Sequence, residues 1–251
     1  MTALVTRPEL HAQVWTALGT VLDPELDEPI TDLGFVTSCV VADGAAQVRL
    51  RLPTAFCSPS FAYLMASDAY DAVEAVDGIG QVSVVLDDHS DSAVINAGVA
   101  GRLGFAATFP AETSSELDEL RLLFRRKAHQ AYVERVCSAT VGRDGAVEDL
   151  ARLTVGDLPP GRLRDGLLRR RADLGLRLDP SAPVCVDEAG VPWPSDQLAR
   201  RLRFARSVRV SIDGNAHFCR GLLATRYPGA AEAQAQRQHE LLTLSPVRST
   251  R

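Results

Sequence analysis

Cys57 is the residue of this sequence that is best placed to do chemistry. It lies in a short loop, 53–59, directly before a segment whose apolar spacing predicts a helix over 60–76. Backbone N–H groups without helical partners and the positive end of the helix dipole favour a thiolate there. A thiolate is both a nucleophile and a ligand for borderline metals such as iron. We therefore expect a reactive thiol or a metal ligand; the ordinary alternative is a small residue that fills a loop–helix junction.

Two carboxylates lie on loops that we expect to reach the same end of the fold as Cys57. Glu25 follows the first predicted helix, and Asp32 precedes the first predicted strand. Each could bind a metal or act as an acid or base beside the thiol. The alternatives are structural, since Glu25 belongs to an acidic segment, 23–28, that water can solvate. Asp32 can accept hydrogen bonds from neighbouring backbone N–H groups in a turn.

The remaining thiols and histidines give weaker signals. An odd number of widely spaced cysteines without a Cys-x-x-Cys pair argues against a disulfide scaffold and against a self-contained zinc site. His217 and Cys219 would share one face of a predicted strand, so they could hold one metal, although packing in a hairpin is the simpler explanation. His89 could join Cys57 if the end of its strand lies nearby. The five cysteines are Cys39, Cys57, Cys137, Cys185 and Cys219.

The elements that would position Cys57 form a domain over residues 8–110. The predicted order is helix, strand, strand, helix, strand and a further helix, which is a small α/β (α+β) fold. Asp43-Gly44 predicts a tight hairpin between the first two strands. Periodicity predicts helices over 8–22, 60–76 and 93–103 and strands over 35–41, 47–52 and 82–86.

The second half of the chain predicts a mixed α/β extension, 111–229, whose fold the sequence does not assign. A polar tail follows over 230–251, and we expect it to be flexible. The strand over 208–212 is predicted from alternating Val and Ile residues, and it would end at an Asp-Gly turn. The other predicted elements are helices over 114–137, 162–174 and 195–205 and a short strand over 184–186.

Composition limits the classes of partner. The formal net charge is -5, with 27 basic and 32 acidic residues, which does not favour nucleic acid. No apolar run is long enough to cross a bilayer, and residues 1–10 lack the layout of a signal peptide, so we expect a cytoplasmic protein. Arginines at 169–171 and 200–206 predict solvated helix faces or a surface for an acidic protein. Glycines over 98–104 have the wrong spacing for a dinucleotide loop.

Three segments resemble the iron–sulfur cluster assembly family that includes the SufT and PaaD proteins. They are Asp-Pro-Glu at 23–25, Ile-Thr-Asp-Leu-Gly-Phe-Val at 30–36, and the Thr-containing loop that ends at Cys57. The resemblance covers about residues 8–110, with three departures. Ser58 separates Cys57 from the proline that follows it directly in the family, and the threonine lies one position closer to the cysteine. Asp-Asp-His-Ser at 87–90 stands where the family often has a tryptophan.

The resemblance implies a small α/β scaffold with a reactive cysteine that matures iron–sulfur or other iron enzymes. Cys57 would bind iron or an iron–sulfur cluster transiently, with Glu25 and Asp32 as further ligands or as residues that shape its loop. The partner would be a client metalloprotein, and because some relatives occur with multicomponent iron oxygenases, a diiron monooxygenase component is a reasonable client. The family also implies a homodimer. The residues leave two alternatives open: a metal-free adaptor or chaperone that binds an oxygenase subunit, and an enzyme that uses Cys57 as a nucleophile.

Overall fold

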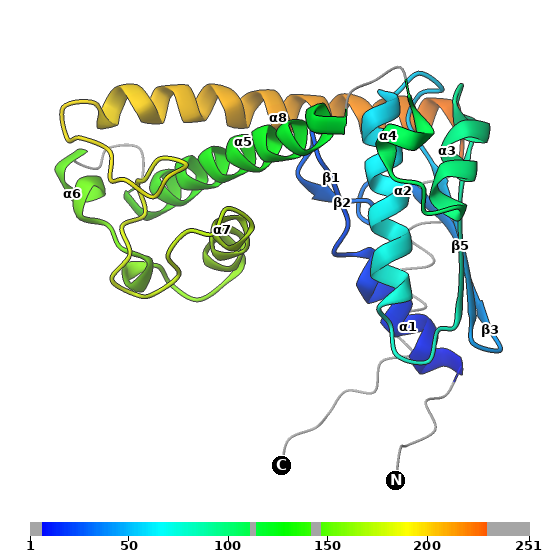
Figure 1. The fold of residues 1–251 in the computed structure, drawn as a ribbon. Coiled ribbons are helices and arrows are strands. Elements are labelled where there is room, and N and C mark those ends of the chain that lie inside the picture. Colours follow the sequence, from blue (N-terminus) through cyan, green and yellow to red (C-terminus); the bar gives the residue numbers. More distant parts are fainter. Residues whose placement is uncertain (1–6, 111–113, 142–146, 230–251) are drawn as a thin grey trace, which may run out of the picture. The chain divides into compact units, whose positions relative to one another are not determined.

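The computed structural model describes residues 7–110, 114–141 and 147–229 (Figure 1). The chain divides into two compact units. The first runs to Leu117 and takes up the chain again from Ala216, and the second is Asp118–Asn215. The predicted flexible tail, 230–251, lies outside the described residues. Among the helices described, none combines the length and the apolar character needed to cross a membrane.

The first unit is built on a three-stranded sheet with the order β3-β4-β5. β3 (Val36–Ala42) pairs antiparallel with β4 (Ala45–Arg51), and β5 (Gln81–Asp87) runs parallel to β4. Asp43 and Gly44 both have positive φ, as a tight hairpin of this kind requires. Alternate residues of β4 are buried, so one face of the sheet is covered. The predicted strands and hairpin of this unit are therefore confirmed.

Helices pack against this sheet and complete the predicted α/β class. α1 (Arg7–Leu18), α2 (Pro59–Glu74) and α3 (Ser92–Ala100) contact its strands, and the short α4 (Phe105–Thr108) packs on α3 (Figure 1). α1 ends earlier than predicted, because residue 22 enters a small hairpin in which β1 (Leu22–Asp23) pairs with β2 (Glu28–Pro29). The helix predicted over 93–103 also ends early, at a turn in which Arg102 and Gly104 have positive φ.

The second unit is helical in its described residues. It contains most of α5 (Ser114–Val141), α6 (Val147–Arg152), a 3-10 turn at Val155–Asp157, and α7 (Arg162–Asp173). The strand predicted over 184–186 is wrong, since only isolated bridges form there, Thr154 with Pro183 and Val186 with Pro192. The extension predicted as mixed α/β is thus a helical unit with its own apolar core.

The last helix overturns a second strand prediction. α8 (Leu198–Arg226) is continuous through 208–212, through the Asp-Gly pair and through His217, so that histidine and Cys219 do not share a strand face. Its buried residues recur with a helical period, and Val210 is exposed. No Asp-Gly turn forms there, and the Asp213 carboxylate pairs within the helix with Arg209 and also with Arg135 of α5. The buried residues of α8 are Leu198, Ala205, Ile212, Ala216 and Leu223.

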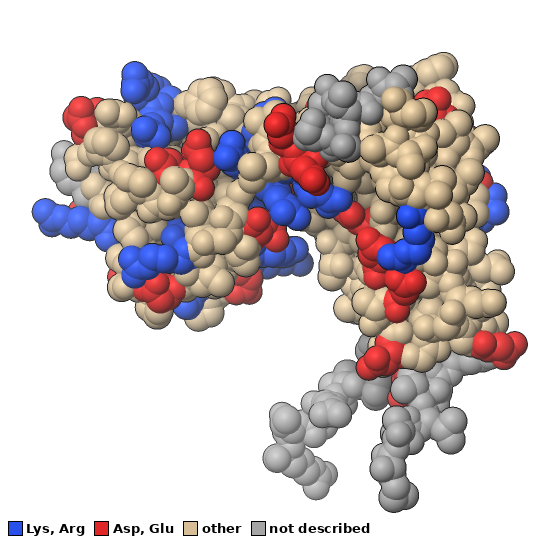
Figure 2. All heavy atoms as spheres, viewed as in Figure 1, with Lys and Arg blue, Asp and Glu red and all other residues tan. Residues whose placement is uncertain are grey.

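Two arginines of the 169–171 run are buried, so the expected solvated basic face is only partly present. Arg171 is 1% exposed and donates to the carbonyl oxygens of Arg177 and Pro183. Arg170 lies over the Tyr132 ring at 3.7 Å. Figure 2 shows acidic and basic side chains interspersed over the visible face rather than one extended basic patch.

Candidate functional site

The Cys57 thiol stands at the junction between β4 and α2. Its Sγ lies 3.5 Å from the Thr54 hydroxyl, which also accepts the Phe56 backbone N–H at 3.1 Å. Ser58 is the N-cap of α2 and Pro59 opens its first turn. The Ser58 side chain makes no capping hydrogen bond. Cys57 is half-buried and therefore reachable, one residue ahead of the cap of a sixteen-residue helix, where the helix dipole favours negative charge.

His89 fixes the backbone of the Cys57 loop. Its Nε2 lies 2.8 Å from the Cys57 carbonyl oxygen, and its Nδ1 accepts the Asp91 N–H at 3.1 Å. With Nδ1 as the acceptor, the ring proton is on Nε2 and donates to the loop. The Ser90 N–H donates to the Ala55 carbonyl at 2.9 Å. The structure thus brings His89 to Cys57, but both ring nitrogens are engaged, so the imidazole positions the loop and is not available as a ligand.

Asp23 organises the turn that carries Glu25. Asp23 is 7% exposed, and one of its carboxylate oxygens accepts the N–H groups of Glu25 and Leu26, both at 2.9 Å. Burial raises the pKa of Asp23 to about 6, although these two hydrogen bonds oppose the rise. Asp23 is therefore a structural member of the Asp-Pro-Glu segment, and half-buried Glu25 is the member that faces outward from the turn.

Asp32 lies in a separate turn. Its side chain is exposed and accepts a hydrogen bond from the Thr31 hydroxyl at 3.4 Å, and its backbone N–H donates to the Pro29 carbonyl at 3.0 Å. These interactions are local to the entry of β3.

The end of α8 reaches the Cys57 region, and sequence reasoning missed it. Ala216 and Leu223 are buried in the core of the first unit. Arg226 donates to the carbonyl oxygens of Leu52, at 3.3 Å, and Asp88, at 2.7 Å. These two residues directly follow β4 and β5. The apolar spacing of the helix was a detectable signal, but the alternation over 208–212 pointed to a strand.

Cys219 lies on this docked part of α8, close to the predicted site. Burial raises its pKa to about 11, and the charges of Asp23, Cys57 and Glu25 raise it further. Arg220 opposes this effect and is ion-paired with Glu28. The structure therefore places the Cys57 thiol and two carboxylates within electrostatic range of Cys219. Within the described ranges, however, no three His, Cys, Asp or Glu side chains are grouped tightly enough to hold a metal ion.

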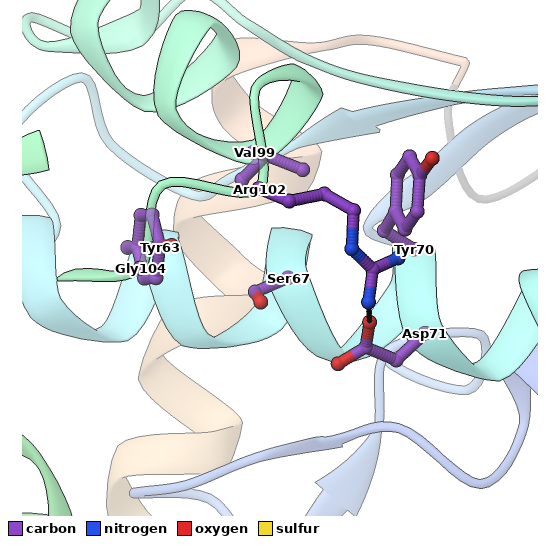
Figure 3. A pocket seen from close by; sticks show the side chains of 7 residues that line it. All are labelled: Tyr63, Ser67, Tyr70, Asp71, Val99, Arg102 and Gly104. Carbon is purple, nitrogen blue, oxygen red and sulfur yellow. Dashed lines mark hydrogen bonds and ion pairs between the residues drawn. The ribbon is translucent and has the colours of Figure 1, made fainter.

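A separate hollow lies over α2 and the turn after α3 (Figure 3). The Arg102 guanidinium crosses it, stacks on Tyr70 at 5.0 Å and pairs with Asp71 at 3.2 Å and with Glu74. None of the seven residues drawn in Figure 3 is a cysteine or a histidine. The lining of the hollow therefore offers no thiol chemistry.

A family model described as "Iron-sulfur cluster assembly protein" matches residues 11–84, which hold β1 to β4, α2 and Cys57. Three of the relatives found are iron-sulfur cluster carrier proteins. Those of Mycobacterium tuberculosis (strain ATCC 25618 / H37Rv) and Mycobacterium bovis (strain ATCC BAA-935 / AF2122/97) are 40% identical over 84 residues. That of Mycobacterium leprae (strain TN) is 37% identical over 84 residues.

The similarity is confined to part of each protein. It covers 33% of this chain and 22% of the first two relatives, or 21% of the third. The chain thus spans about a fifth of the length of the curated relatives that it matches. The second unit, 118–215, lies outside the segment matched by the family model.

Proposed function

Because the N-terminal domain of this chain belongs to the iron–sulfur cluster assembly family, we propose that the protein carries iron or an iron–sulfur cluster transiently and passes it to a client metalloprotein. The observation that carries the proposal is the position of Cys57. It is a half-buried thiol in a loop held by His89, ahead of a helix N-terminus, within the matched segment. A carrier needs a thiol that can bind its cargo and also release it.

The surroundings of the thiol suit transfer to another protein. Phe56, the residue before Cys57, is 84% exposed. A large apolar side chain in this position is typical of a contact surface, because aromatic residues supply much of the binding energy at protein interfaces. The cargo would then be released where the recipient docks.

We further propose that the client is an iron enzyme and that the helical second unit takes part in recognising it. A diiron monooxygenase component is the client that the family resemblance favours, in a cytoplasmic setting and with the carrier as a homodimer. The second unit has its own core and lies outside the matched segment, which supports a function of its own. Client capture would test recognition by the second unit. The full chain should capture the client, and a variant with surface residues of the second unit removed should not.

Anaerobic reconstitution with iron and sulfide tests the carrier function directly. We expect the full chain to bind iron, with visible absorption from thiolate ligation, and to pass it to an apo-ferredoxin. Cys57→Ser should lose both properties. Cys39→Ser is the matched control, because Cys39 is a partly buried thiol of the same domain, with a pKa raised by burial to about 11.

Two outcomes would contradict the proposal. If the wild type and Cys57→Ser bound equal amounts of iron, the Cys57 thiol would not be the ligand that the proposal requires. A wild-type protein that binds no iron, yet forms a stable complex with a metalloprotein, would instead support the metal-free adaptor.

A further inference from the structure

We propose that Cys219 is a second thiol ligand for the cargo that Cys57 carries, so that the site is assembled from two distant parts of the chain. The inference rests on the proposed function and adds to it a residue outside the matched segment 11–84. The chain segment that follows the second unit would then have a chemical purpose, which is to return a thiol to the first unit.

The position of Cys219 is fixed by two arginines that follow it along α8. Arg220 forms an ion pair with Glu28 of β2, next to the turn that carries Glu25. Arg226 lies seven residues after Cys219, which places the two on the same face of the helix, about 10 Å apart along its axis. Arg226 bonds the Leu52 and Asp88 carbonyl oxygens.

These anchors lead directly to the loop of Cys57. Leu52 is the last residue before the loop, and Asp88 immediately precedes His89, whose imidazole bonds the Cys57 carbonyl. Tyr227 adds a hydrogen bond from its hydroxyl to the Asp88 carboxylate at 3.2 Å. The end of α8 and the Cys57 loop are therefore both hydrogen-bonded to the segment that contains Asp88 and His89.

The two thiols also share their packing. Cys57 and Cys219 are both partly buried, and both pack against the core of the first unit, in which Ala216 and Leu223 are buried on either side of Cys219 along the helix. Partial burial protects a bound metal while leaving a path for exchange. Cys137 and Cys185 are different, because both are buried in the second unit with their sulfurs 3.4 Å apart.

The charges around Cys219 favour a cation. Asp23, Glu25 and Cys57 act on Cys219 with the same sign, and the Arg220 guanidinium, which opposes them, is engaged by Glu28. Binding of ferrous iron would release one proton to solvent from each thiol and form two iron–sulfur bonds. Iron–sulfur clusters take four thiolates, so a two-thiol site leaves half of the ligand set to another molecule. That incomplete set suits a carrier, because the recipient or a second copy can complete it.

An anaerobic titration with Co²⁺, a spectroscopic substitute for ferrous iron, tests the assignment on the reduced full chain. The sulfur-to-cobalt charge-transfer band grows with the number of thiolates bound. Cys57→Ser and Cys219→Ser should each lose roughly half of the band or more, because each removes one of two metal–sulfur bonds. His217→Ala is the matched control, since this exposed residue lies two positions away and should leave the band unchanged.

The outcomes separate the two proposals. A band that Cys57→Ser abolishes and Cys219→Ser leaves intact overturns the second ligand and keeps the carrier function. A band insensitive to both substitutions overturns both. Because a variant could lose binding through misfolding, a second test uses the metal-free wild type. A short bifunctional alkylating reagent should bridge Cys57 to Cys219 in peptides identified by mass spectrometry, and failure to bridge them, with each of the two thiols alkylated singly, would overturn the inference.

Discussion

Leu223→Ala should loosen the end of α8 from the first unit. Leu223 is 6% exposed and belongs to the same core cluster as the sheet residues. Leu-to-Ala substitutions in cores lower the free energy of unfolding by about 2–5 kcal/mol, depending on how far the site collapses. Leu223 lies near the end of its helix, where the backbone can relax, so we expect the lower part of this range, about 2–3 kcal/mol.

Urea unfolding followed by far-ultraviolet circular dichroism measures this change in the full chain. Phe218→Ala is the matched control, because Phe218 is a large apolar residue of the same helix that is 65% exposed. A surface change of this kind should alter the free energy of unfolding by less than about 0.5 kcal/mol. The contrast between the two variants isolates burial from helix propensity, since both introduce alanine into α8.

The thiols provide a second readout of the same substitution. When the helix end is docked, Cys219 is half-buried, so its alkylation should be slow. Leu223→Ala should speed alkylation of Cys219 several-fold more than that of Cys137, which belongs to the second unit. A Leu223→Ala protein with unchanged urea midpoint and unchanged Cys219 alkylation would refute the docking of α8 on which the two-thiol site depends.

Three further changes have defined outcomes. Asp23→Asn should raise the free energy of unfolding at pH 7 by on the order of 1–3 kcal/mol, because a pKa raised from 3.8 to about 6 penalises the ionised folded state. The free energy of unfolding of the wild type should therefore rise as the pH falls from about 6 toward 4, and Asp23→Asn should lack that rise in urea titrations. The same pH dependence in both proteins would contradict the prediction. Gly98→Ala should destabilise by about 1–3 kcal/mol, since a Cβ would meet the Thr108 hydroxyl at 2.2 Å. Adding Thr108→Ala should recover only part of the loss in thermal melts, because the Thr108 Cβ, at 2.9 Å, remains. Cys137 and Cys185 should react with alkylating reagents only on unfolding, because both are buried; rapid labelling of the native chain, detected by mass spectrometry, would argue against that core.

The first unit was largely predictable because its signals are local. Alternation along β4, the Asp43-Gly44 hairpin and the helix after Cys57 each reflect a period or a turn that a short segment sets by itself. The loop position of Cys57 followed from the same reasoning. Whether Cys57, Glu25 and Asp32 act on a metal stays a prediction. Glu25 lies within electrostatic range of Cys219, and Asp32 accepts a hydrogen bond from the Thr31 hydroxyl.

The helical identity of 208–212 was decided by tertiary structure. Val208, Val210 and Ile212 satisfy a strand pattern, but in the fold the residues that need burial are Ala205, Ile212 and the next apolar positions of α8, which recur at a helical period. Intrinsic preference for strand is weak, and packing along a whole helix outweighs it.

The sequence by itself determined the sheet of the first unit, the hairpin and a thiol at a helix N-terminus, because neighbouring residues set these features. Tertiary structure alone decided that Cys219 returns to the first unit, within electrostatic range of that thiol. The two cysteines are separated by the whole second unit, and their proximity depends on the burial of Leu223 and on the bonds of Arg226 to Leu52 and Asp88. Contacts over such a separation leave no periodic trace in a single sequence, because they are set by how the surfaces of folded elements fit together.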